Sequence, residues 1–446
     1  MHQAQIRSPE SLAQLWGTVT AVQSGMIEIS GISDLVGVGN EIFIDKPAGR
    51  IYGEILTVAR DTVRALLFAE GSDVRLGDIV WVTEEAVIEI GDHWLGQIVN
   101  YRGEPMQISP SKALGWSVSR PLKSSPPAAH ARRRLGPRLS TGFMVTDTLL
   151  PICSGQRIGL FAGSGVGKST LLGGLASGMT ADRVVIGLIG ERSREVNEFV
   201  KRKLDPEALE RTVIVAATAS ESPGAKKRAA YCAVAAAEHF RDQGHSVLFL
   251  FDSLTRFAEA HREVALHAGE TPALNAYPPS TARVVAELAE RTGPGADGQG
   301  DITAIYSVLV AGSDMEEPVA DMVRGILDGH IVLSRSIAER DRFPAIDVLR
   351  SVSRCLPMAA SGPENELLGQ YRQRVALYED VMPMLRANLF EFGKDLEADR
   401  AIRQFPQLDQ FVSERNRSGT ADAFERLSVL LDRDKDNSGS AEAGQE

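Results

Sequence analysis

Short runs of alternating apolar and polar residues follow one another through the first part of the chain, separated by Gly, Asp or Asn. They cover residues 16–22, 26–30, 40–44, 49–58, 62–68 and 78–83. Short strands at this spacing predict a small antiparallel β-barrel, which we place at residues 19–95. Residues 1–18 precede it, and within them residues 9–16 can form at most a short amphipathic helix. We interpret 1–18 as a docking segment, with a frayed terminus as the alternative.

Beyond residue 140 the pattern changes to continuous apolar runs that alternate with helical stretches. These apolar runs lie at 157–161, 184–189, 213–218, 247–251 and 302–310. Continuous apolar strands separated by helices are typical of a parallel sheet covered on both faces, because right-handed crossovers place helices there. We therefore predict an α/β fold with this parallel sheet at its centre, in residues 141–358.

The segments on either side of the predicted sheet have different compositions. Residues 96–140 become rich in Ser, Pro, Ala and Arg and predict a linker without a core, in which the run Arg132–Arg134 forms a solvated surface. Residues 359–432 have helical spacing and predict a C-terminal helical domain. Residues 433–446 are polar, and we expect a disordered tail.

Composition narrows the class of protein. The chain has 446 residues and a formal net charge of −11, which argues against a body that wraps nucleic acid. Its three cysteines, Cys153, Cys232 and Cys355, are too few and too widely spaced for a disulfide framework or a zinc cluster. We expect buried thiols in a reducing compartment. No apolar run approaches the ~18 residues of a membrane span, so we expect a cytoplasmic protein.

The strongest chemical signal is a glycine-rich segment, AGSGVGKST, which follows the apolar run 157–161 and precedes a helical stretch. Glycines there let successive backbone N–H groups turn around a phosphate with no Cβ in the way. Lys168 adds a positive charge at the β- and γ-phosphates, and Ser169 can place its hydroxyl on Mg²⁺. Ala162 stands where the strict pattern has Gly. The predicted phosphate-binding residues are Gly163, Ser164, Gly165, Val166, Gly167, Lys168, Ser169 and Thr170.

Two carboxylates follow neighbouring apolar runs. Asp252 ends one run and Glu191 follows another. Because ligands bind at the carboxyl ends of parallel strands, we expect both acids near the γ-phosphate of a nucleotide. Asp252 would support the Mg²⁺ shell through water, or else cap the next helix. Glu191 would polarise the attacking water, or else pair with Arg192 or Arg194.

Longer segments carry a family resemblance. CSGQRIGLFAGSGVGKSTLL, IGERSREVNEFV, LFDSLTRFAEAHREV, ILDGHIVLSRSIAER and FPAIDVLRSVSR occur in the order found in the type III secretion ATPases. Within that group the chain is similar to the flagellum-specific export ATPases, and it shares PAIDVLRSVS with the catalytic subunits of rotary F-type ATP synthases. The resemblance implies a RecA-like P-loop domain and is strong over 141–357. It is looser at 219–228, 270–285 and 384–400.

The resemblance also implies roles for individual residues. The glycine-rich loop would hold ATP, and Glu191 would be the catalytic carboxylate. Arg192 and Arg256 would face the γ-phosphate, and Phe343 would stack on adenine. Arg354 matches the arginine finger that reaches into the site of a neighbouring subunit. Because one chain carries the loop, Glu191 and Arg354 together, every interface of a homohexamer could be catalytic.

The function that the resemblance implies is Mg²⁺-dependent hydrolysis of ATP in a homohexameric ring that energises export of flagellar proteins through a type III secretion apparatus. The implied partners are a stator-like regulator at the N-terminal segment, a coiled-coil stalk protein at the helical end, chaperone–substrate complexes and the export gate at the inner membrane. The protein would be cytoplasmic and peripherally associated with that membrane.

Other functions remain open at this point. Export ATPases of injectisomes share every motif quoted above. A catalytic subunit of a rotary ATP synthase is disfavoured because its loop usually ends in Lys-Thr, whereas this one ends in Lys-Ser. A hexameric nucleic-acid translocase is disfavoured because the predicted barrel offers scattered Arg60, Arg64 and Arg75 without an aromatic ladder. Lys168 and Glu191 argue against a non-enzymatic scaffold.

Overall fold

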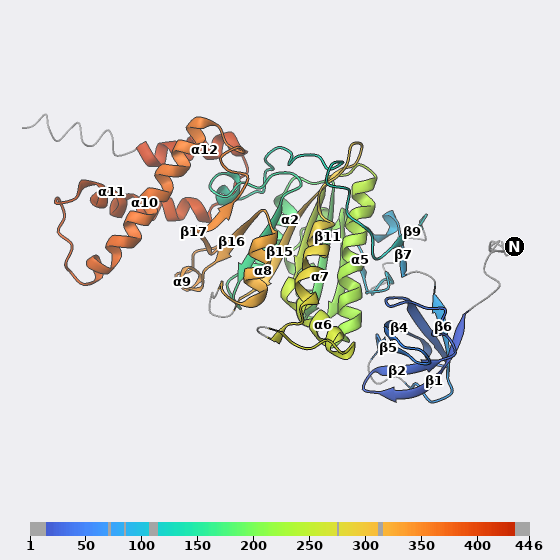
Figure 1. The fold of residues 1–446 in the computed structure, drawn as a ribbon. Helices are drawn as coiled ribbons and strands as arrows, with labels where there is room; N and C mark the ends of the chain where they lie inside the picture. Colours follow the sequence, from blue (N-terminus) through green and yellow to red (C-terminus); the bar gives the residue numbers. More distant parts are fainter. Residues whose placement is uncertain are drawn as a thin grey trace, which may run out of the picture.

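The computed structural model describes residues 15–69, 73–83, 86–106, 115–273, 276–310 and 315–432. A β-barrel, a sheet covered by helices and a helical unit follow one another from the blue to the red end of the chain (Figure 1). The docking segment and the disordered tail expected at the two ends fall almost wholly outside the described residues. None of the described helices is long and apolar enough to cross a bilayer.

The N-terminal unit is a closed barrel with the strand order β1-β2-β5-β4-β3-β6, in which all neighbours are antiparallel, as predicted. Alternate side chains fill its interior, including Ile27, Ile29 and Ile42, which are at most 1% exposed. Trp16 begins the first strand and is not part of a helix. The strands are β1 (Trp16–Gln23), β2 (Met26–Ser30), β3 (Glu41–Lys46), β4 (Gly49–Val58), β5 (Val63–Leu67) and β6 (Ile79–Thr83).

The central sheet has the order β17-β16-β10-β15-β13-β11-β12-β8, and β14 pairs with β15. From β16 to β8 all neighbours in this order are parallel, which confirms the predicted parallel sheet, while β17 and β14 pair antiparallel. The strands are β8 (Ile98–Val99), β10 (Arg157–Ala162), β11 (Arg183–Glu191), β12 (Thr212–Thr218), β13 (Val247–Asp252), β14 (Gly293–Pro294), β15 (Asp301–Leu309), β16 (Gly329–Leu333) and β17 (Ile346–Ser353).

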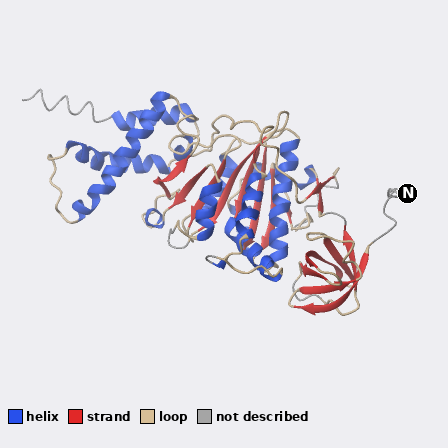
Figure 2. Cartoon of the chain, viewed as in Figure 1, coloured by secondary structure: helices blue, strands red, loops and turns tan. Residues whose placement is uncertain are grey.

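Helices cover both faces of this sheet (Figure 2), as expected. Successive residues of β11 point to opposite faces, so that Val184 and Ile186 enter one core and Val185 the other. The first core takes α2 (Lys168–Gly178), α3 (Ser193–Arg202) and α4 (Pro206–Glu210), and the second takes α5 (Pro223–Asp242), α6 (Leu254–His267), α7 (Ser280–Glu290) and α8 (Pro318–Ile326). The short helical turns are Asp92–Trp94, α1 (Met144–Asp147) and α9 (Arg335–Ala338).

The segment 96–140, expected as a linker, is partly built into these layers. Its β8 adds to the edge of the central sheet, and β9 (Val118–Pro121) pairs with β7 (Val87–Ile90). Arg132, expected on a solvated surface, donates instead to the backbone carbonyl of Thr292 at 3.2 Å. Composition does not predict these contacts, because the partners lie up to 160 residues away along the chain.

The C-terminal unit is helical, as predicted, and in the described residues its helices are α10 (Gly362–Arg386), α11 (Leu396–Ser413) and α12 (Thr420–Asp432). A capping box starts α10, in which Ser361 and Glu364 each bond the backbone of the other. Leu368 and Phe411 of this unit belong to the same core as Leu171 of α2. The helical unit therefore packs on the face of the sheet that α2 covers.

Candidate nucleotide-binding site

The glycine-rich loop joins β10 to α2 near the middle of the sheet. Gly165 and Gly167 have φ angles of 78° and 89°, a backbone region that L side chains rarely adopt. Gly167 is the N-cap of α2 and has no side chain to bond the first N–H groups of the helix. These N–H groups and the positive end of the helix dipole make this position suitable for an anion.

A cavity of about 750 Å³ opens over this loop. It is lined by most of the loop and by predicted residues from three other elements, namely Glu191 at the end of β11, Arg192 before α3 and Arg256 in α6. Lys168 and Ser169 line it from the start of α2. The fold thus gathers into one cavity predicted site residues that are up to 93 positions apart in the sequence, from Gly163 to Arg256.

Lys168 connects the two predicted carboxylates. Its Nζ contacts Asp252 and lies 3.4 Å from Oε1 of Glu191. Asp252 is 3% exposed and also accepts a hydrogen bond of 2.5 Å from the hydroxyl of Ser307 on β15. The strand order β10-β15-β13-β11 explains this cluster, because each of these strands ends at the same edge of the sheet.

In this structure both carboxylates have partners other than those of the two simpler roles. The N-cap of α6 is Ser253, whose hydroxyl accepts from the backbone N–H of Arg256, so Asp252 does not cap that helix. Glu191 pairs with Lys168, while Arg192 pairs with Glu195 at 3.6 Å.

The charges of this cluster shift one another's protonation. Burial opposes the charge of Lys168, but attraction to Asp252 and Glu191 outweighs it, so the pKa of Lys168 lies above its usual value. Burial raises the pKa of Glu191, and the nearby Glu195 adds to the rise while Lys168 opposes it. Glu191 is therefore a stronger base than an exposed glutamate, as a group that orients or activates water requires.

The two arginines of the cavity are in different environments. The Arg192 side chain is 83% exposed. Arg256 donates to Glu259 at 2.7 Å, and it lies against Gly190, where an added Cβ would be 2.9 Å from the Cβ of Arg256. Gly190 has a φ of 74°, so close packing and backbone conformation both favour glycine directly before Glu191.

Phe343 and Arg354 lie outside the residues that line the cavity. The Phe343 ring is beside the glycine-rich loop, because a Cβ added at Gly167 would be 3.0 Å from it, and the residue is 44% exposed. Arg354 follows β17 with an exposed side chain that donates to the carbonyl of Arg324 at 3.3 Å. The structure does not bring Arg354 to the phosphate loop of its own chain.

Sequence reasoning missed Ser307 and Glu259. A signal for Ser307 exists, since a polar residue interrupts the apolar run 302–310 near the end where the other site residues gather. Glu259 lies three residues after Arg256 on α6, a spacing that predicts contact but not its relevance to the cavity.

Oxygen donors at the cavity and beside it fit Mg²⁺. Ser169 lines the cavity, whereas Asp252 contacts Lys168 and is not one of the lining residues. The two offer a hydroxyl and a carboxylate, which are ligand types that Mg²⁺ prefers. Within the described part of the chain, no group of three or more His, Cys, Asp or Glu side chains could hold a metal ion. Such a cavity suits a magnesium ion bound largely by nucleotide phosphates and water.

Comparisons with known proteins match a nucleotide-binding domain and the overall fold. Residues 142–353 match the ATP synthase alpha/beta family, nucleotide-binding domain. The chain is 43% identical to a flagellum-specific ATP synthase of Caulobacter vibrioides, over 94% of this chain and 96% of that protein. It is 42% identical to the SPI-2 type 3 secretion system ATPase of Salmonella typhimurium, over 73% of this chain and 74% of that protein.

A solved structure matches most of the fold. It is the assembled ATPase EscN in complex with its central stalk EscO, from the type III secretion system of enteropathogenic E. coli. The TM-score is 0.84 at 35% sequence identity, and the match covers 93% of this chain and all of that one. The likeness thus includes the barrel, the central sheet and the C-terminal helices.

Proposed function

The chain belongs to the flagellum-specific ATP synthases and type III secretion ATPases, and from that membership we propose that it hydrolyses MgATP in a homohexameric ring to energise export of flagellar proteins. The observation that carries the chemistry is the cluster of Lys168, Glu191 and Asp252 beside a helix N-terminus. The flagellar assignment is supported by similarity over 94% of the chain, against 73% for the SPI-2 ATPase.

The loop residues Gly163–Thr170 hold the triphosphate in this proposal. Their backbone N–H groups donate to the phosphate oxygens, and Lys168 exchanges its contact with Asp252 for one with the β- and γ-phosphates. Ser169, and Asp252 through water, would hold a magnesium ion, which would supply positive charge to the phosphate oxygens. Asp252 keeps the hydrogen bond from Ser307, which fixes its orientation.

Glu191 orients the water that attacks the γ-phosphorus. It accepts a hydrogen bond from that water, and its raised pKa improves it as an acceptor of the proton. Arg192 and Arg256 donate to the γ-phosphate. Each must first leave a carboxylate three residues further along the chain, Glu195 and Glu259 respectively, and an anion in the cavity supplies the competing attraction.

Arg354 acts in the site of a neighbouring copy. Its side chain is exposed and lies away from the loop of its own chain, which agrees with a role across an interface between copies. An arginine finger stabilises the charge that develops on the transferred phosphoryl group and is worth roughly 10³- to 10⁵-fold in rate. Phe343, exposed beside the loop, stacks on the adenine ring.

The partners follow from the relatives and from the exposed ends of the fold. A ring of identical copies with a central stalk protein is supported by the assembled EscN and its central stalk EscO. We propose in addition that the stalk is a coiled coil and that it contacts the C-terminal helices. We extend the proposal to a stator-like regulator at residues 1–18, to chaperone–substrate complexes and to the export gate. The ring would work in the cytoplasm, attached to the inner membrane at that gate, with no role for nucleic acid.

Steady-state hydrolysis by the purified full-length chain tests this function. We expect Mg²⁺-dependent activity whose specific rate rises with protein concentration as rings form. Glu191→Gln should bind nucleotide but turn over at least about 100-fold more slowly. Arg354→Ala should lose most activity, while Arg350→Ala, which changes another exposed arginine near the end of β17, is the matched control.

Subunit mixing tests the action in trans. Copies with Arg354→Ala keep an intact loop, and copies with Glu191→Gln keep an intact finger. Random assembly of equal amounts pairs one intact site with one intact finger at about a quarter of the interfaces, so about a quarter of the full activity should return. A specific activity that is independent of concentration, with Arg354→Ala fully active, would show that the ring mechanism is wrong.

A further inference from the structure

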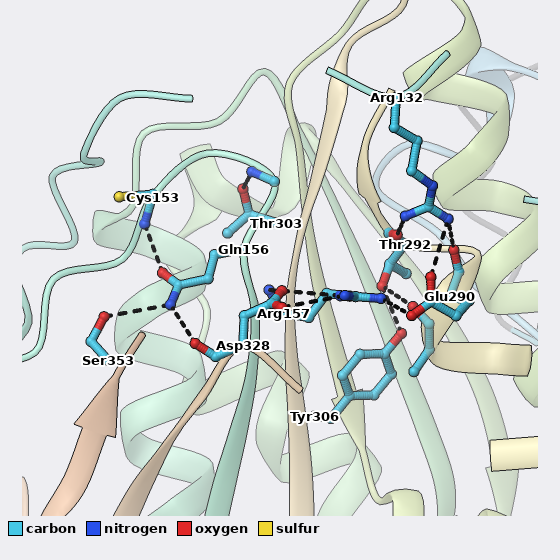
Figure 3. Close-up of polar contacts among 12 residues, drawn as sticks. Arg132, Cys153, Gln156, Arg157, Glu290, Thr292, Thr303, Tyr306, Asp328 and Ser353 are labelled. Carbon is cyan, nitrogen blue, oxygen red and sulfur yellow. Dashed lines mark hydrogen bonds and ion pairs between the residues drawn. The ribbon is translucent and has the colours of Figure 1, made fainter. Parts of the chain in front are cut away.

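A buried polar network lies at the end of the sheet opposite the nucleotide cavity (Figure 3). Gln156, which directly precedes β10, is at its centre and has no exposed surface. Its Oε1 accepts from the backbone N–H of Cys153 at 2.9 Å. Its Nε2 donates to the carbonyl of Asp328 at 3.0 Å and to the hydroxyl of Ser353 at 3.4 Å.

The two groups that accept hydrogen bonds from the Gln156 amide, the Ser353 hydroxyl and the Asp328 carbonyl, lie next to the backbone of Arg354. Ser353 is the preceding residue, and its hydroxyl donates to the carbonyl of Pro151 at 2.6 Å. The Asp328 carbonyl also accepts from the backbone N–H of Arg354 at 3.2 Å. The buried side-chain amide of Gln156 thus bonds both to Ser353 and to the carbonyl that accepts from the backbone N–H of Arg354. These contacts position the start of the turn that contains Arg354.

The network holds Asp328 firmly on its other side. Arg157 donates to the Asp328 carboxylate from its backbone N–H at 3.1 Å and from Nε at 3.0 Å. Arg157 also pairs with Glu290 at 2.5 Å, and Arg132 donates to the backbone carbonyl of the same glutamate. Asp328 is therefore a fixed point against which Gln156 and Arg354 are aligned.

The Arg354 side chain depends on this backbone support, since its guanidinium makes a long hydrogen bond of 3.3 Å to the carbonyl of Arg324 and is otherwise exposed. We propose that Gln156 is a positioning residue for Arg354, acting through Ser353 and the carbonyl of Asp328. This inference rests on the proposed role of Arg354 in the neighbouring site. Because Gln156 also directly precedes β10, the strand that leads to the glycine-rich loop, it connects the finger of each copy to that copy's own nucleotide-binding strand.

Gln156→Met tests the inference in the full-length chain, because it keeps the length of the side chain and removes its hydrogen bonds. A finger displaced by about 1 Å loses on the order of 10²-fold in rate, so we expect kcat to fall about 10- to 100-fold. KM for MgATP should stay within about 2-fold, because the loop of the same chain is intact. Tyr306→Phe is the matched control. It removes a buried hydrogen bond between Tyr306, on β15 of the same sheet, and Thr292, and it should leave kcat unchanged.

Combination with Arg354→Ala separates positioning from a general structural role. If Gln156 acts through Arg354, Gln156→Met should change kcat by less than about 2-fold in the Arg354→Ala background. Mixing Gln156→Met with Glu191→Gln should restore activity, because the second copy supplies a well-placed finger. Mixing Arg354→Ala with Glu191→Gln tests whether Arg354 acts in the neighbouring site. The role of Arg354 and the positioning role of Gln156 can therefore be tested separately.

Several outcomes would overturn the inference. One is a normal kcat for Gln156→Met while Arg354→Ala is impaired. Another is a decrease in kcat on Gln156→Met that has the same size in the wild type and in the Arg354→Ala variant. If Gln156→Met fails to assemble, Ser353→Ala replaces it, with an expected loss of about 3- to 10-fold in kcat that disappears in the Arg354→Ala background. Normal kcat in Ser353→Ala would then overturn the inference. No gain of activity on mixing Arg354→Ala with Glu191→Gln would refute the finger in trans, and the role of Gln156 with it.

Discussion

Lys168→Met should destabilise the nucleotide-free protein as well as abolish ATP hydrolysis. Lys168 is the cation that contacts Asp252, and their side chains are 11% and 4% exposed. Methionine keeps most of the volume of lysine but leaves the Asp252 carboxylate with the hydroxyl of Ser307 and without a counter-charge. The P-loop lysine therefore has a structural role in addition to its role in binding phosphate.

The magnitude follows from the burial of the pair. Removing one partner of a buried ion pair costs about 3–5 kcal/mol, because an uncompensated charge remains. For a unit of about 200 residues, 1 kcal/mol corresponds to roughly 2–4 °C, so we expect a fall in Tm on the order of 10 °C. The Glu191 contact, at 3.4 Å and with greater exposure, should add less.

Thermal unfolding without nucleotide, followed by circular dichroism, is the assay. Adding Asp252→Asn to Lys168→Met should restore most of the lost Tm without restoring hydrolysis, because the unpaired charge is gone while the phosphate contact is still missing. A Tm within about 2 °C of the wild type at pH 7, or no recovery in the double variant, would refute the reasoning.

Three further changes have defined expectations. Gly190→Ala should lower kcat at least about 10-fold in steady-state assays, because the new Cβ meets Arg256 and disturbs Glu191; wild-type kcat would contradict this. Burial lowers the pKa of His261 to about 4, so protonation favours the unfolded chain and stability should fall by about 2 kcal/mol from pH 7 to pH 5. His261→Gln should flatten that dependence in melts across pH, and an unchanged slope would count against it. Phe343→Ala should raise KM for MgATP about 10-fold while Phe343→Tyr preserves it, and equal KM values would reject stacking.

Much of the fold could be predicted because it depends on local patterns. The barrel strands, the five apolar strands of the sheet and the C-terminal helices each have the periodicity of their element, and all of them formed. The segment 96–140 was harder to interpret, because composition describes what a segment can bury by itself. Its strands β8 and β9 and the contact of Arg132 exist because distant backbone offers them partners.

The site divides in the same way. The motif around Lys168 and the placement of Glu191 and Asp252 after apolar strands were readable, since parallel strands end at a common edge. The pairing of Lys168 with Asp252 was not, and neither was the hydrogen bond from Ser307 to the same carboxylate. These contacts span 84 and 55 residues and depend on the strand order.

The sequence by itself determined the helices and strands, the phosphate-binding loop and the family to which the chain is similar, because each of these depends on residues that are close together in the sequence. Tertiary structure decided which charges face one another and which backbone is held. The bond from Gln156 to Ser353 spans 197 residues and follows from the positions of β10 and β17 in the sheet. Electrostatic and hydrogen-bond energies depend on the distance between groups and on their burial. Distance and burial are set only when the sheet and its covering helices have packed together.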